Sequence, residues 1–222
     1  MTPEYSRAAI AAMQMLIDRN VTETPIDPMP ILLDYPGVRV MSFTRFANQA
    51  NIEREDLVPL FVANQDAATF NLRTAIDNIN YVVVYNARLP YEIICRGIAR
   101  ELGHIVLGHD GLHKPLQVRR SEALTFAHHL ITPRPVIRII QESKVPLTMN
   151  VLSDTLGCSD ECVFDMQEIP GHACKVPAEM NRQVRAQFER GINEYLRFRQ
   201  TTIYRDHSPM VDLGLYMDDY EE

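Results

Sequence analysis

The sequence lacks any apolar run approaching the ~20 residues that a helix needs to cross a bilayer, so we expect no membrane-spanning segment and no membrane partner. Its N-terminus also lacks the charged-then-apolar pattern of a secretory signal. We therefore expect a cytoplasmic protein. Cysteine is scarce, with four residues at Cys95, Cys158, Cys162 and Cys174. In a cytoplasmic protein these are expected to be thiols rather than disulfides.

Positive charge is also in short supply. Lys and Arg number 22 against 29 Asp and Glu, which gives a formal net charge of −7. A nucleic-acid-binding surface needs a basic patch or stripe, so no direct nucleic-acid partner is expected. With 222 residues, 46% of them hydrophobic, the chain is long enough to bury a core and is typical of a globular protein.

Hydrophobic spacing predicts an α+β fold with three strands and a helical C-terminal region. Thr44 is expected to cap the second of the predicted helices, and Pro90 to open the central one. The strands are predicted at 38–43, 67–73 and 81–86. The helices are predicted at 4–18, 44–50, 90 to 108 or 111, 119–133, 135–142, 148–156, 160–169 and 177–199, with a helical turn at 31–35.

The chain is predicted to divide into a domain at 1–142, a helical region at 143–200 and an acidic tail at 201–222. The segment 149–169 is similar to a helix-turn-helix, but its second half, DECVFDMQEI, is acidic and would repel phosphate. Packing or docking of a protein partner is therefore the better interpretation of this segment.

The central predicted helix carries Arg100-Glu101-Leu102-Gly103-His104, one residue away from a zinc-peptidase motif. In H-E-x-x-H, two imidazoles one helical turn apart bind zinc, and the Glu between them acts as general base on the metal-bound water. Here Glu101 is the candidate base and His104 a candidate ligand, whereas Arg100 stands at the first ligand position. A guanidinium stays protonated and offers no lone pair to a metal. Arg100 is instead expected to form an ion pair with Glu101 or Glu122.

The next predicted helix, at 119–133, has the sequence RRSEALTFAHHLITP and carries Glu122. This carboxylate is suited to be the third ligand of a two-His, one-Glu zinc site. Together with RELGHIVLGH before it, this sequence resembles the ImmA/IrrE family of metallo-endopeptidases, over roughly residues 25–169. The resemblance implies a zincin-like domain with a small, mostly antiparallel sheet packed on the motif helix. It also implies roles for Glu101 as base and for His104 and Glu122 as ligands, and a protein partner that is a repressor or another regulator of a phage, mobile element or stress response.

Four weaker candidates could replace the missing ligand: His109, Asp110, His113 and His129. His109 lies five residues after His104, about 140° around a helix, so the two can share a metal only if the helix ends first, which Gly108 permits. His129 lies about 10 Å along the helix from Glu122, too far to share a metal without distortion. For each candidate, an ordinary surface or hydrogen-bonded residue is the competing interpretation.

A second zinc site is a further option, formed by Cys158 and Cys162 with His172 and Cys174. The spacing matches no common zinc knuckle, and the two closely spaced cysteines fit equally well as apolar residues of a helix pair.

Three functional hypotheses follow from these patterns. The first is a catalytically impaired, peptidase-like regulator that acts by binding a repressor, with zinc weakly bound or absent because Arg100 removes one ligand. The second is an active zinc endopeptidase that cleaves a repressor through a rearranged site. The third is a purely structural interaction module.

Overall fold

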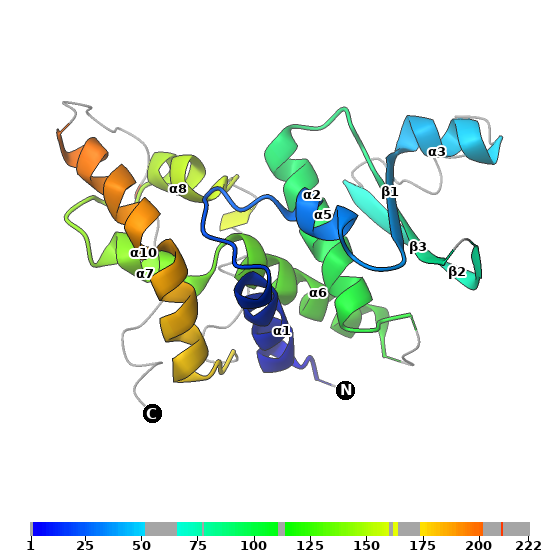
Figure 1. Ribbon diagram of the computed structural model, residues 1–222, viewed down its shortest axis with the longest axis horizontal. Coiled ribbons are helices and arrows are strands. Elements are labelled where there is room, and N and C mark those ends of the chain that lie inside the picture. Colours follow the sequence, from blue (N-terminus) through cyan, green and yellow to red (C-terminus); the bar gives the residue numbers. More distant parts are fainter. Residues whose placement is uncertain are drawn as a thin grey trace. The chain divides into compact units, whose positions relative to one another are not determined.

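The computed structural model describes residues 2–51, 66–76, 78–110, 114–159, 162–163, 174–201 and 210, without the side chains of 73–76 and 201. The contacts between residues divide the chain into two compact units, and Figure 1 shows the elements of both. Residues 27–113 form the sheet unit, and residues 1–26 with 114–222 form the helical unit. These divisions fall at 26/27 and 113/114, and the boundaries at 142/143 and 200/201 stay predictions from the sequence.

The sheet unit has three strands in the order β1-β3-β2 within its described residues: β1 (Val38–Ser42), β2 (Ala67–Ile76) and β3 (Ile79–Tyr85). β3 is central, pairs parallel with β1 from Val38↔Tyr81 onward, and pairs antiparallel with β2 from Ala67↔Tyr85 onward. Asn78 turns the chain between β2 and β3 with φ of 63°. The sheet is therefore mixed rather than mostly antiparallel, because one of its two strand pairs is parallel and the other antiparallel.

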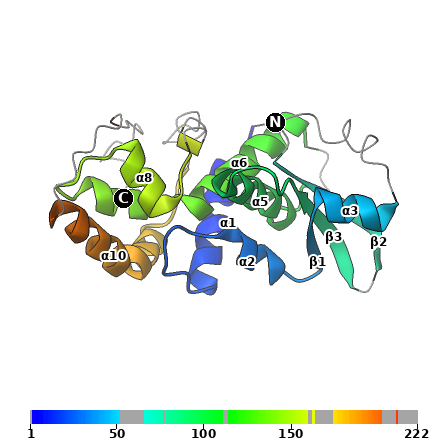
Figure 2. The same cartoon turned by 90° about the horizontal axis from the view of Figure 1, so that it is seen from above.

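The two faces of the sheet carry different side chains. One face packs against α3 (Phe43–Ala50) through a small core centred on Met41, Ala47, Val82 and Val84. The other face, which strand alternation gives to Asn71, Tyr81 and Val83, lies against α5 (Tyr91–Val106). α2 (Pro28–Leu33) packs on β1 and α5, as Figure 2 shows. The motif helix thus lies on the sheet, as expected.

The end of α5 is a Schellman turn. Gly108 adopts φ of 66°, its N–H donates to the carbonyl of Ile105 at 3.1 Å, and the N–H of His109 donates to that of His104 at 3.0 Å. Glycine suits this position because left-handed φ costs it little. The helix therefore ends before His109, and the chain folds back on itself there.

The helical unit is built from α1 (Tyr5–Asp18), α6 (Leu116–Ile131), α7 (Arg134–Gln141), α8 (Met149–Leu156) and α10 (Ala178–Thr201). α1 packs on α6 and α10, and α10 packs on α7. Alanines on α1 allow its close approach to α6, and the long helix α10 buries one apolar stripe. That stripe consists of Val184, Phe188, Ile192 and Leu196.

Most predicted elements are confirmed within a few residues, with some corrections. Ser42, not Thr44, caps α3, accepting the N–H of Arg45 at 3.3 Å. α6 begins at Leu116, three residues earlier than predicted, so Glu122 lies in its second turn. Residues 160, 161 and 164–169 of the predicted last short helix, and the predicted tail apart from 201 and 210, lie outside the described residues. Within the described part of the chain, none of the helices has the length and apolar character needed to span a membrane.

Candidate functional site

Arg100 lies between two buried carboxylates of the sheet unit. Its Nη2 donates to Asp66 Oδ1 at 2.7 Å and to Glu101 Oε1 at 3.0 Å, and it also reaches the carbonyl of Ala67 at 3.2 Å. The side chains of Asp66 and Glu101 are 3% and 8% exposed, against 24% for Arg100. The predicted ion pair with Glu101 is therefore present, and one guanidinium links two carboxylates.

Asp66 is a residue that the sequence analysis missed. It directly precedes β2, where its Oδ1 also accepts the N–H of Ala67 at 2.9 Å, and Arg96 lies 3.8 Å from its Oδ2. Gly97 allows this approach, because a Cβ there would lie 2.7 Å from the carboxyl carbon of Asp66. Gly97 lies inside an otherwise helical pattern, one turn before Arg100. A glycine at such a position indicates that another part of the chain packs closely against the helix.

Burial governs the chemistry of Glu101. It raises the pKa of the Glu101 carboxyl above its usual value, and the charge of Arg100 offsets only part of that effect. Burial alone would lower the pKa of Arg100, but the carboxylates of Asp66 and Glu101 outweigh this effect. The net result is a pKa above the usual value for arginine, so the guanidinium stays charged. Glu101 is thus a carboxyl group able to exchange a proton nearer neutrality than a solvated glutamate.

His104 and His109 face each other. Their Nδ1 atoms lie 2.8 Å apart, and the rings meet edge to face with centroids 5.0 Å apart. The two nitrogens are within hydrogen-bond distance, and which ring donates depends on which of them carries the proton. The condition set by the sequence for His109, that the helix must end before it, is met by the turn at Gly108.

Asp110 is held by the sheet. The hydroxyl of Tyr81 donates to its Oδ2 at 3.0 Å, and the side-chain amide of Asn71 donates to the same oxygen. These contacts occupy the carboxylate on the face that carries α5. His113 lies outside the described residues.

Glu122 belongs to the helical unit, where it joins three segments. Its carboxylate accepts the backbone N–H of Glu4 at 2.8 Å and two contacts from Lys114 Nζ at 2.9 and 3.0 Å. The Glu122 side chain is 1% exposed, and Lys114 also contacts Glu4 at 2.6 Å. In this arrangement Glu122 fixes the start of α1 to α6, and its charge is compensated by a lysine.

His129 is a core residue of the same helix. Its Nδ1–H donates to the carbonyl of Thr125 at 2.9 Å, and burial lowers its pKa to about 3. The His129 ring therefore stays neutral and is hydrogen-bonded within its own helix. This is an ordinary structural role, not that of a metal ligand.

The residues present do not fit a two-His, one-Glu zinc site. The first ligand position holds a guanidinium that is already bonded to Asp66 and Glu101, and a fixed positive charge there opposes a divalent cation. Among the described residues, no group of three or more His, Cys, Asp or Glu side chains is gathered closely enough to hold a metal ion.

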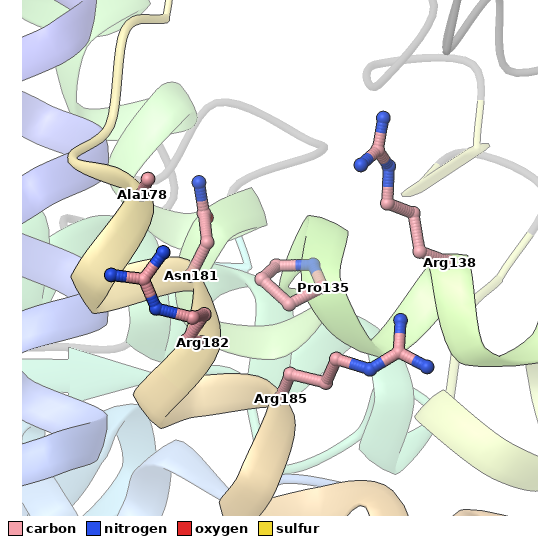
Figure 3. A pocket seen from close by; sticks show the side chains of 6 residues that line it. All are labelled: Pro135, Arg138, Ala178, Asn181, Arg182 and Arg185. Carbon is pink, nitrogen blue, oxygen red and sulfur yellow. The ribbon is translucent and has the colours of Figure 1, made fainter. Parts of the chain in front are cut away.

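A separate cavity of about 190 Å³ lies between α7 and α10 of the helical unit, lined partly by three arginines (Figure 3). Their guanidinium groups point in different directions in Figure 3. Arg185 is bonded to Glu142 at 2.7 and 3.0 Å, and Arg182 is paired with Glu179. The charges of Arg182 and Arg185, two of the three arginines, are thus compensated by carboxylates of the chain itself.

Comparisons of the chain with protein families, with curated proteins and with solved structures find no match. The resemblance to the ImmA/IrrE family therefore rests on the motif residues alone.

Proposed function

We propose that this chain is an ImmA/IrrE-like regulatory protein that acts by binding a repressor or a comparable regulator, without metal-dependent peptide cleavage. The observation that carries the proposal is the ion-pair network of Arg100 with Asp66 and Glu101. A cation supplied by the protein compensates the carboxylates at this position and cannot activate water as a Lewis acid does.

The residues that surround Arg100 support this proposal. Arg100 is bonded to both acids, Gly97 leaves room for Asp66, and Asp66 is almost fully buried. An arginine tolerated by chance at the first ligand position would not need a buried acid and a glycine to accommodate it. This arrangement supports a site whose carboxylates are compensated without zinc.

The proposal is tested by co-expressing the chain with the helix-turn-helix regulator encoded nearest to its gene, the partner that the family resemblance implies. We expect the two to co-purify in the presence of EDTA, with the regulator intact by mass spectrometry. Glu101→Gln is expected to retain this binding, because the proposed role needs no catalytic base at this position. A regulator that is cut by wild type and spared by Glu101→Gln contradicts the proposal.

A second candidate function, an active zinc endopeptidase with a rearranged site, is favoured by one observation. The Nδ1 atoms of His104 and His109 lie 2.8 Å apart, so a separation increased by about 0.5 Å would match the roughly 3.3 Å between two nitrogen ligands of a tetrahedral zinc. This function requires zinc that is retained by wild type and lost in both His104→Gln and His109→Gln.

A further inference from the structure

Two cysteines of the helical unit lie with their sulfur atoms in contact. Cys158 Sγ lies 3.7 Å from Cys162 Sγ, and the two residues are 2% and 4% exposed. We call them the thiol pair. All four cysteines are free thiols, and a sulfur–sulfur contact is recorded for Cys158 and Cys162. The thiol pair is therefore the place in the described chain where a disulfide needs the least rearrangement.

Local geometry brings the pair together. Gly157 ends α8 with φ of 64°, which turns the chain so that Cys158 follows directly. Ser159 then caps the next helical turn, its hydroxyl accepting the N–H of Cys162 at 3.3 Å. A disulfide needs the two sulfurs at about 2.05 Å, so they must approach by roughly 1.7 Å, which rotation of two side chains can supply.

A third group lies beside the pair. The Nδ1 atom of His128 is 3.9 Å from Cys162 Sγ, where it can accept a hydrogen bond from the thiol. Cys158 donates to Cys162, and this bond together with burial raises the pKa of the Cys158 thiol well above its usual value. Because the imidazole of His128 lies beside Cys162 as a proton acceptor, we assign the attack on the oxidant to Cys162 and closure of the disulfide to Cys158.

We propose that Cys158 and Cys162 are an oxidative modification site, at which hydrogen peroxide converts the two thiols into a reversible disulfide. The sulfur of Cys162 attacks one peroxide oxygen, the O–O bond breaks, and the thiol proton leaves with the second oxygen as water. The sulfur of Cys158 then attacks the sulfenic acid, and a second water leaves. Two thiols are oxidised and one peroxide is reduced to two waters.

Burial decides which oxidant reaches the site. Cys158 and Cys162 are 2% and 4% exposed as whole residues, so a bulky disulfide reagent has little access to them, whereas hydrogen peroxide is small and uncharged. The site is separate from Arg100 and Glu101, so this inference does not depend on the proposed function.

The test treats the full-length chain with hydrogen peroxide, blocks remaining thiols, and measures intact mass and non-reducing peptide maps. We expect a product lighter by two hydrogen atoms, with Cys158 cross-linked to Cys162, and full reversal by dithiothreitol. Cys158→Ser and Cys162→Ser should abolish this product, while the matched controls Cys95→Ser and Cys174→Ser should retain it. If a serine variant fails to fold, the peptide map of oxidised wild type still shows whether Cys158 is cross-linked to Cys162.

A trapping experiment tests the order of events. In Cys158→Ser, dimedone should label the sulfenic acid of Cys162, whereas Cys162→Ser should give no label at Cys158. His128→Gln should slow disulfide formation by about 100-fold, the low end of what a positioned proton acceptor contributes. Oxidation of Cys95 with the thiol pair left reduced, or zinc held by the pair in purified wild type, would overturn the proposal.

Discussion

Replacing Asp66 by asparagine should reveal how much the chain depends on its buried ion pair. The substitution keeps the size of the side chain and an oxygen for the N–H of Ala67, but it removes one of the two carboxylates bonded to Arg100. Leaving one member of a buried pair uncompensated costs about 3–5 kcal/mol. Because the Arg100 side chain is 24% exposed and keeps Glu101, we expect a smaller loss of about 2 kcal/mol in the free energy of unfolding.

The assay is urea unfolding followed by far-UV circular dichroism, since the sequence contains no tryptophan to report by fluorescence. Amide hydrogen exchange over residues 27–113 should locate the loss in the sheet unit. Glu179→Gln is the matched control, because its partner Arg182 is 69% exposed and the pair should contribute about 0.5 kcal/mol or less. Asp66→Asn within about 0.5 kcal/mol of wild type would refute the reasoning.

Glu122→Gln should lower the free energy of unfolding by about 2 kcal/mol, because it leaves Lys114 without its buried partner; a variant as stable as wild type in urea unfolding would contradict this. His129 has a pKa lowered from 6.5 to about 3, so its unfolded form takes up a proton that the folded form refuses, and stability falls as pH drops below 6.5. Urea unfolding of wild type should show about 2 kcal/mol less stability at pH 5 than at pH 8 from this group, and His129→Gln should lose that dependence. Gly97→Ala should destabilise by about 1 kcal/mol in the same assay although alanine favours helix, since its Cβ would displace Asp66; a stabilised variant would show that Asp66 moves freely.

Much of the fold was predictable because it depends on local signals. The β-branched run of β3 marked the central strand, and Gly108 and Gly157 marked turns that the structure places at positive φ. What the sequence could not supply is pairing between distant segments. The parallel pairing of β1 with β3 depends on how the long connection between them runs, and the pattern of each strand is compatible with either direction.

The candidate site divides in the same way. The Arg100–Glu101 ion pair follows from residue chemistry within one helix, and it was expected. Asp66 was missed because it is 34 residues away in sequence from Arg100, and no spacing rule connects them. The bonds of Glu122 to Lys114 and to the backbone of Glu4 also required the tertiary structure, because they join segments far apart in the chain.

The measurement that tests the central claim most directly is the zinc content of wild type, purified without chelator or added metal, beside Arg100→His. If the guanidinium of Arg100 stands where a metal would otherwise be required, wild type should contain far less than one zinc per chain and be unchanged in stability by EDTA. About one zinc per chain in wild type, lost in His104→Gln, would contradict the claim and identify the chain as a metalloprotein.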